Sequence, residues 1–80
     1  MSTDHVLALM QKALPSPDDR VSVKAEGMAT ILTWYWQQGG KNMAFRRKIF
    51  HVCTDPETAI EFACREAKAY IEEWQREEAP

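Results

Sequence analysis

Aromatic and basic side chains are concentrated in one stretch of the chain, residues 31–50. Trp34, Tyr35 and Trp36 are consecutive, and four cations follow them: Lys41, Arg46, Arg47 and Lys48. Aromatic rings can stack on nucleic-acid bases and cations can contact phosphates, as in sheet platforms that hold single strands. This stretch supports one hypothesis, nucleic-acid binding, with Trp34, Trp36 and the four cations as its site.

Potential metal ligands occur at His51, Cys53 and Cys64, and the first two lie two residues apart on one predicted strand. Structural zinc sites take four ligands in paired close spacings. His5 is the only other histidine, so the ligand set is incomplete and we expect neither a metal site nor a cofactor. A small metal-binding or thiol protein remains a further alternative. Cys53 ends a predicted strand and Cys64 lies well inside the predicted final helix, so the two are too far apart for a disulfide. We therefore expect two reduced thiols.

Catalytic motifs are not evident in the sequence. It has no glycine-rich phosphate loop, no histidine pair at helical metal-binding spacing and no Gly-x-Ser-x-Gly nucleophile motif. Cys53 and His51 could be written as a thiolate pair, but no third group orients them. A chain of 80 residues also leaves little room for a concave pocket. We therefore expect the protein not to be an enzyme.

Charge is divided along the chain. Residues 20–48 carry six cations and one acid, a net of +5, whereas residues 55–80 carry three cations and eight acids, a net of −5. Mutual neutralisation and solubility are one explanation of this pattern. The overall charge of −2 and the pI of about 5.6 argue against general nucleic-acid affinity.

The composition also bears on location. No run approaches the roughly 20 apolar residues that a membrane-spanning helix needs. The first residues lack a basic leader and a small-residue cleavage site. We expect a cytoplasmic protein without a membrane partner.

Residues 1–26 predict a helix and a strand. Ser2, Thr3 or Asp4 can cap a helix whose apolar face runs from Val6 to Leu14, and Pro15 and Pro17 end it. Residues 20–26 alternate between polar and apolar side chains: Arg20, Ser22, Lys24 and Glu26 face one way, and Val21, Val23 and Ala25 face the other. This alternation is typical of a half-buried strand.

A hairpin over residues 29–52 is the centre of the predicted fold. The run from Ile31 to Trp36 is rich in β-branched and aromatic residues, and Gly39 and Gly40 allow the chain to reverse. The second run, Met43 to Val52, has no cleanly apolar parity, so we expect a β-bulge near Arg46–Lys48 that switches faces.

The last predicted element is a helix that begins near Pro56 and ends near Arg76. Thr54 is the expected N-cap, with Glu57 completing a capping box and Pro56 in the first turn. Its apolar face is formed by Ile60, Ala63, Ala67, Tyr70, Ile71 and Trp74. Residues 1–2 and 77–80 are expected to fray.

Together these elements predict one small α+β domain over residues 1–80. The order is α-β-β-β-α, with a three-stranded antiparallel meander and both helices on one sheet face. In its order of elements the chain resembles the double-stranded-RNA-binding domain. That resemblance implies a lysine-rich start to the final helix, but this chain has Asp55, Glu57 and Glu61 there.

The favoured function is a non-enzymatic protein–protein interaction through the open sheet face. Tyrosine and arginine are enriched at the centres of protein interfaces. The candidate site is Tyr35, Phe45, Arg46, Arg47 and Lys48. The expected partner is another protein or a second copy of the chain in a homodimer. Compact domains of this kind, with few motifs, are typical of small phage, prophage and accessory bacterial proteins.

Overall fold

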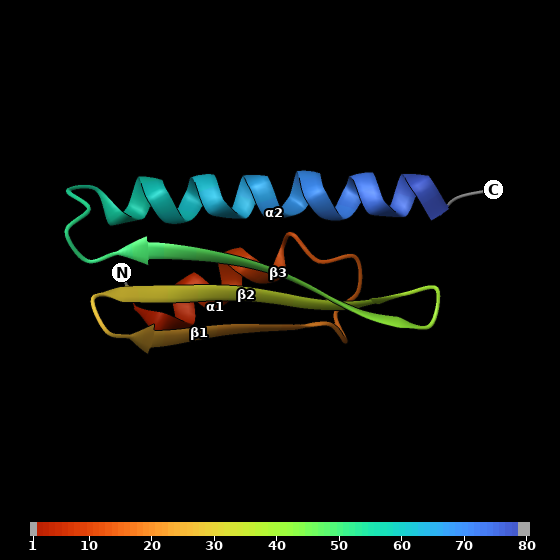
Figure 1. Cartoon of the computed structure of the whole chain (residues 1–80), viewed down its shortest axis with the longest axis horizontal. Helices are drawn as coiled ribbons and strands as arrows, with labels where there is room; N and C mark the ends of the chain where they lie inside the picture. Colours follow the sequence, from red (N-terminus) through yellow and green to blue (C-terminus); the bar gives the residue numbers. More distant parts are fainter. Residues whose placement is uncertain (1, 79–80) are drawn as a thin grey trace.

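The computed structural model describes residues 2–78 and has the predicted order of elements (Figure 1). The elements are α1 (Thr3–Gln11), β1 (Arg20–Glu26), β2 (Ala29–Gln38), β3 (Lys41–Phe50) and α2 (Pro56–Glu78). The three strands form one antiparallel sheet in the order β1-β2-β3. The prediction of a small α+β domain with a three-stranded meander is confirmed.

Both tight turns depend on glycine. Gly39 and Gly40 have φ angles of 57° and 79°, the combination that a type I′ hairpin turn requires. Gly27, with φ of 60°, opens the other turn. Two-residue turns of this kind match the right-handed twist of their strands, so they hold both hairpins in register.

The β2–β3 ladder runs without interruption from Ala29↔Phe50 to Gln38↔Lys41. The expected bulge near Arg46–Lys48 is therefore wrong. The parity that contains Met43, Phe45 and Ile49 faces the helices along the whole strand, and it includes Arg47. A charged residue at this position is accommodated by a partner on α2, as described below.

Both helices cover the same face of the sheet. Leu32, Trp34 and Trp36 of β2 are at most 2% exposed and pack in one core with residues of both helices. The helical members are Val6 and Met10 of α1 and Ala63, Ala67 and Ile71 of α2. The Trp34 indole Nε1 donates a hydrogen bond of 3.0 Å to the Met10 carbonyl. Figure 1 shows α1 behind the strands and α2 alongside β3.

The helix α1 is shorter than predicted. Ser2 is its N-cap and accepts a hydrogen bond from the His5 amide, but the helix ends at Gln11, before the prolines. The Gln11 side chain donates to the Asp19 carbonyl, and the Asp19 carboxylate accepts from the Ser16 amide. These bonds stabilise the turns of residues 12–19 that lead into β1.

The N-cap of α2 lies one residue later than expected. The Asp55 carboxylate, not Thr54, accepts hydrogen bonds from the Thr58 amide (3.2 Å) and the Thr58 hydroxyl (2.7 Å). Pro56 lies in the first turn, as predicted, and is the first helical residue. Asp55 is the better cap here because a carboxylate can accept both bonds at the positive end of the helix dipole.

The ends of the elements also differ slightly from expectation. β3 ends at Phe50, although the His51 amide still donates a hydrogen bond of 2.8 Å to the Met28 carbonyl. Fraying was expected for residues 1–2 and 77–80, but Ser2 caps α1 and α2 continues to Glu78. The remaining residues of that prediction, 1, 79 and 80, lie outside the described residues. Between residues 2 and 78, no helix combines the length and hydropathy needed to cross a membrane.

Candidate interaction surface

The sheet face opposite the helices has no element of the described chain packed on it. Even-numbered residues of β2 face the helices, so odd-numbered residues, and the β1 and β3 residues in register with them, face away. Ile31 and Thr33 form the middle of this open face and are flanked by long side chains on both neighbouring strands. Figure 1 looks onto this face.

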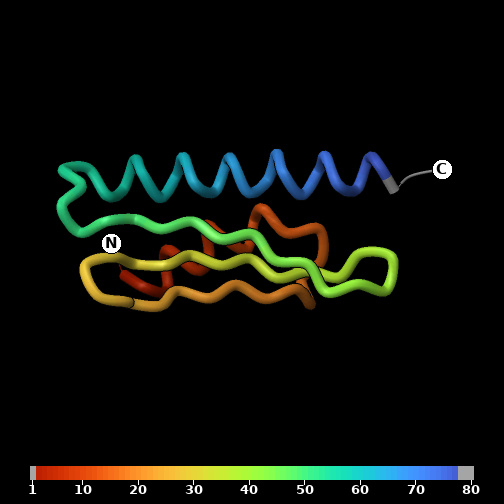
Figure 2. Tube along the Cα trace, viewed as in Figure 1, coloured from red at the N-terminus to blue at the C-terminus, as the bar shows by residue number. Residues whose placement is uncertain are grey.

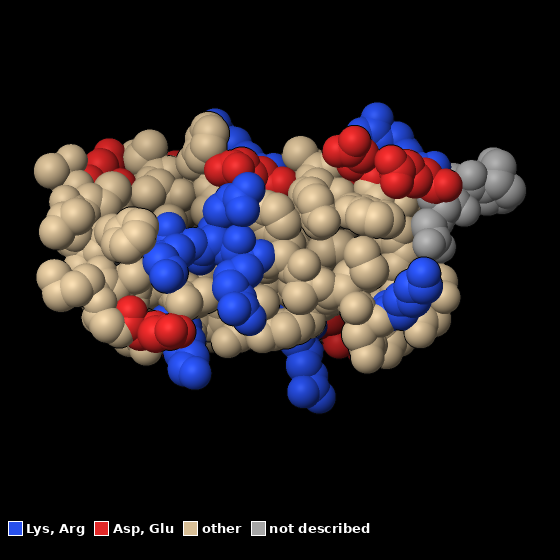
Figure 3. All heavy atoms as spheres, in the orientation of Figure 1, with Lys and Arg blue, Asp and Glu red and all other residues tan. Residues whose placement is uncertain are grey.

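The open face is basic. Its cations come from both outer strands: Arg20 and Lys24 from β1, and Arg46 and Lys48 from β3. Glu26 is the one acid in register with them. Figure 3 shows cations clustered in the middle of the face, with acidic side chains gathered mainly along α2. A net charge of +3 on one side of a chain with net charge −2 gives the molecule a strong electrostatic polarity.

Two aromatic side chains on the open face reach solvent. Tyr35 is 42% exposed and lies between Arg20 and Ala44 in the register. Phe50 is 56% exposed at the other end of the sheet, with the Lys48 ammonium 5.9 Å from its ring centroid. These rings provide apolar contact area beside cations, a combination that is common at interface centres.

The structure divides the residues predicted for protein binding between two faces. Tyr35, Arg46 and Lys48 lie on the open face. Phe45 and Arg47 lie on the helix-covered face, and Phe45 is only 9% exposed. The expectation of an exposed patch containing Phe45 is therefore corrected, because the strand alternates without a bulge.

Arg47 is held by contacts with α2 and its own strand. Its guanidinium donates to Oε2 of Glu66 at 2.9 Å and lies 4.3 Å from the centroid of the Phe45 ring. Phe45 in turn packs on Tyr70, with 4.7 Å between ring centroids. The ion pair and the stacked rings attach α2 to the edge of the sheet, so Arg47 has a structural role.

The residues proposed for base stacking lie in the core. Trp34 and Trp36 are 0% and 2% exposed, so neither ring can meet a base in this conformation. The Trp36 indole donates to the Gln38 side chain, which donates to the Trp74 carbonyl. Lys41 is exposed at the tip of the β2–β3 hairpin, away from the cations of the open face.

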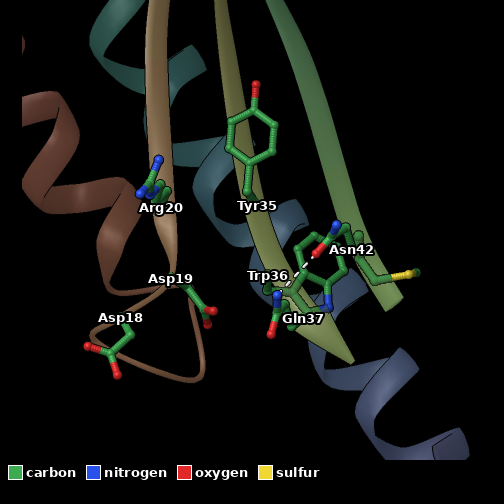
Figure 4. Close-up of a pocket in the computed structure, with 8 residues that line it drawn as sticks. Asp18, Asp19, Arg20, Tyr35, Trp36, Gln37 and Asn42 are labelled. Carbon is green, nitrogen blue, oxygen red and sulfur yellow. Dashed lines mark hydrogen bonds between the residues drawn. The ribbon is translucent and has the colours of Figure 1, made fainter. Parts of the chain in front are cut away.

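The β2–β3 hairpin extends beyond the start of β1 (Figure 2). A notch of about 630 Å³ lies at this end of the sheet (Figure 4). Trp36 to Gln38 have no partner on β1, because β1 begins at Arg20 opposite Tyr35. Asp18 and Asp19 line one side of the notch, and the other side carries Gln37 and Asn42, whose side chains are hydrogen-bonded. Its lining is mixed, because Trp36 and Met43 contribute apolar surface beside the two aspartates and Arg20.

The two thiols are free, and they lie in different environments. Cys53 is exposed in the loop after β3. Cys64 is half-buried on α2, where desolvation and the neighbouring carboxylate of Glu61 raise its pKa. In the part of the chain that the structure describes, no three histidine, cysteine or acidic side chains are grouped as a metal site requires.

Sequence reasoning missed the β1 half of this surface. Arg20 and Lys24 carry a visible signal, since they alternate with valines on a predicted strand. The register that brings them beside Tyr35 and Arg46 arises only when the strands pair.

No family model matches the sequence, and no curated protein and no solved structure is significantly similar to it.

Proposed function

We propose that the protein is a non-enzymatic interaction module that binds an acidic surface of a partner protein through its open sheet face. The observation that carries this proposal is that one sheet face holds four cations and the exposed ring of Tyr35, with Glu26 as the one acid in register with them. Arg20 lies beside Tyr35 in the register, and Lys24, Arg46 and Lys48 lie beside Ile31 and Thr33. Complementary charge steers association and selects partners.

An acidic partner fits this face better than a second copy does. A two-fold dimer interface places the same surface patch on both subunits. Two patches that each carry a net charge of +3 would then face each other, and like charges brought together in an interface cost several kcal/mol. We therefore propose a different protein as the partner, in place of the homodimer considered from the sequence.

Nucleic-acid binding is the second candidate, supported by the same four cations. It is less favoured because Trp34 and Trp36 are buried, which leaves Tyr35 and Phe50 at opposite ends of the face. Two distant rings make a poor stacking platform for successive bases.

We also propose that the protein acts in the cytoplasm. Cys53 and Cys64 are both free, which fits a reducing compartment.

The test uses fluorescence anisotropy with two labelled probes, a decaglutamate peptide and a single-stranded oligothymidylate. Arg46→Glu reverses a charge on the open face, and Arg65→Glu makes the same change at an exposed position of α2. We expect decaglutamate to bind at low ionic strength and Arg46→Glu to weaken binding at least about tenfold, equivalent to about 1.4 kcal/mol. Arg65→Glu should have little effect.

Salt concentration provides an independent check. The electrostatic screening length falls from about 30 Å at 0.01 M to about 8 Å at 0.15 M, so binding between charged surfaces should weaken over this range. Absence of decaglutamate binding at low salt, or equal losses in the two variants, would overturn the proposal. Tighter binding of oligothymidylate that depends on Arg46 would replace it with the nucleic-acid candidate.

A further inference from the structure

The open face contains a hollow at its centre, with a volume of about 180 Å³. Its lining is Ser22, Lys24, Glu26, Ile31, Thr33, Tyr35 and Arg46. At about 30 Å³ per liquid water molecule, it has room for about six waters. This is too small for most small-molecule ligands, whose pockets are about 300 Å³ or larger, but it can receive one side-chain group.

The floor of the hollow offers an unused hydrogen-bond donor. Thr33 is only 4% exposed, yet its hydroxyl makes no hydrogen bond with any side chain or backbone group of residues 2–78. Buried polar groups normally have partners. Among the described residues, every side-chain oxygen or nitrogen that is fully enclosed has a hydrogen-bond partner. The unpaired Thr33 hydroxyl is therefore not fully enclosed and remains open to the hollow.

The walls supply positive charge from both sides. Arg46 is directly in register with Thr33, and Lys24 is in register with the neighbouring Ile31. Neither Lys24 nor Arg46 takes part in the salt bridge of the described residues 2–78, which joins Arg47 to Glu66. Glu26, two residues from Lys24, is the one carboxylate in the lining. Two cations and one acid leave a net charge of +1, which matches a monoanion.

We propose that this hollow receives a carboxylate group from a glutamate or aspartate side chain of the partner. The Thr33 hydroxyl donates a hydrogen bond to the carboxylate, and Lys24 and Arg46 balance its charge. This assignment rests on the proposed function and identifies the part of the acidic partner that is recognised at the centre of the face. Ser22, in register with Thr33, offers a second hydroxyl in the lining.

The test compares Thr33→Val with Thr30→Val in binding to decaglutamate. Valine keeps the β-branched shape of threonine and removes only the hydroxyl, so the strand is preserved. Thr30 lies on the same strand but outside the hollow, where its hydroxyl is paired with His51. Because a hydrogen bond to a charged group is stronger than a neutral one, we expect Thr33→Val to weaken binding about tenfold and Thr30→Val to leave it nearly unchanged.

The outcomes separate this inference from the proposed function. Unchanged binding by Thr33→Val, together with loss of binding by Arg46→Glu, would overturn the carboxylate site and leave the acidic-partner proposal intact. No binding by the wild-type protein would overturn both. Displacement of decaglutamate by inorganic phosphate at a far lower concentration than by acetate, at matched ionic strength, would identify a phosphate site and overturn the assignment to carboxylate.

Discussion

Arg46, Arg47 and Lys48 are adjacent in sequence and have different roles in the structure. Successive strand residues point to opposite faces, so Arg46 and Lys48 lie on the open face and Arg47 faces α2. An arginine can occupy a helix-covered position if its guanidinium is paired and its stem packs on apolar surface. The guanidinium of Arg47 pairs with Glu66 and also lies over the ring of Phe45.

A double-mutant cycle with Arg47→Ala and Glu66→Ala should give a small coupling free energy. The two side chains are 41% and 37% exposed, so solvent screening limits the ion pair to about 0.5 kcal/mol. Urea unfolding measures the coupling, which should shrink in high salt. Arg46→Ala is the matched control and should change stability by no more than about 0.5 kcal/mol. A coupling that does not respond to salt would contradict this description.

The helix α2 illustrates how an element depends on its first turn. Its N-terminal amides have no partners within the helix, and Asp55 accepts the bond from the Thr58 amide. The hydrogen bond from the Thr58 side chain, and then that from the Thr58 amide, lower the pKa of Asp55. The ionised form is thus the one that the folded helix stabilises.

Asp55→Ala should lower the urea midpoint and the helix content measured by circular dichroism. A carboxyl group with a lowered folded-state pKa contributes stability above its unfolded pKa of about 3.8, and this contribution is lost as the pH falls through the lowered folded pKa. The difference between wild type and Asp55→Ala should therefore be full at neutral pH and shrink at pH values below 3.8. Asp18→Ala, in the exposed loop before β1, should leave the midpoint unchanged. A difference that persists unchanged into acid would show that Asp55 does not act as a charged cap.

At the scale of the whole molecule, the sheet separates an apolar side from a charged side. The core lies between the sheet and the two helices, and Trp34 is its largest fully buried residue. The basic side chains collect on the other side, and many of the acids lie on α2. A single layer of strands thus keeps the core apart from the candidate binding surface.

Trp34→Ala and Tyr35→Ala change adjacent aromatic residues on opposite faces. Removing the buried indole of Trp34 should cost about 3–5 kcal/mol, and the Met10 carbonyl would lose its donor. Tyr35 is 42% exposed, so its truncation should cost only about 1 kcal/mol. Urea unfolding of both variants measures the difference. Similar losses would show that the two faces are not as different as the register implies.

Local patterns were sufficient to determine the order and types of the elements. The alternation of residues 20–26, the Gly39-Gly40 turn and the proline at the start of α2 each predict structure from short-range physical chemistry. The cap of α2 was placed one residue early because Thr54 and Asp55 are both good caps, and only the final backbone path selects between them. The end of α1 was missed because tertiary contacts of Gln11 and Asp19 decide it.

Short-range patterns are enough to predict a helix–meander–helix domain with a basic central hairpin and an acidic final helix. Which face of the hairpin is buried depends on long-range packing. Each parity of β2 has apolar or aromatic side chains, with Leu32, Trp34 and Trp36 on one and Ile31 and Tyr35 on the other, so the strand by itself did not settle the choice. The choice depends on the helices, which pack on Trp34 and Trp36 and leave Thr33 and Tyr35 on the face that carries the cations of β1 and β3. The candidate site is therefore a product of strand pairing, because its residues are distant in sequence and meet only across the sheet.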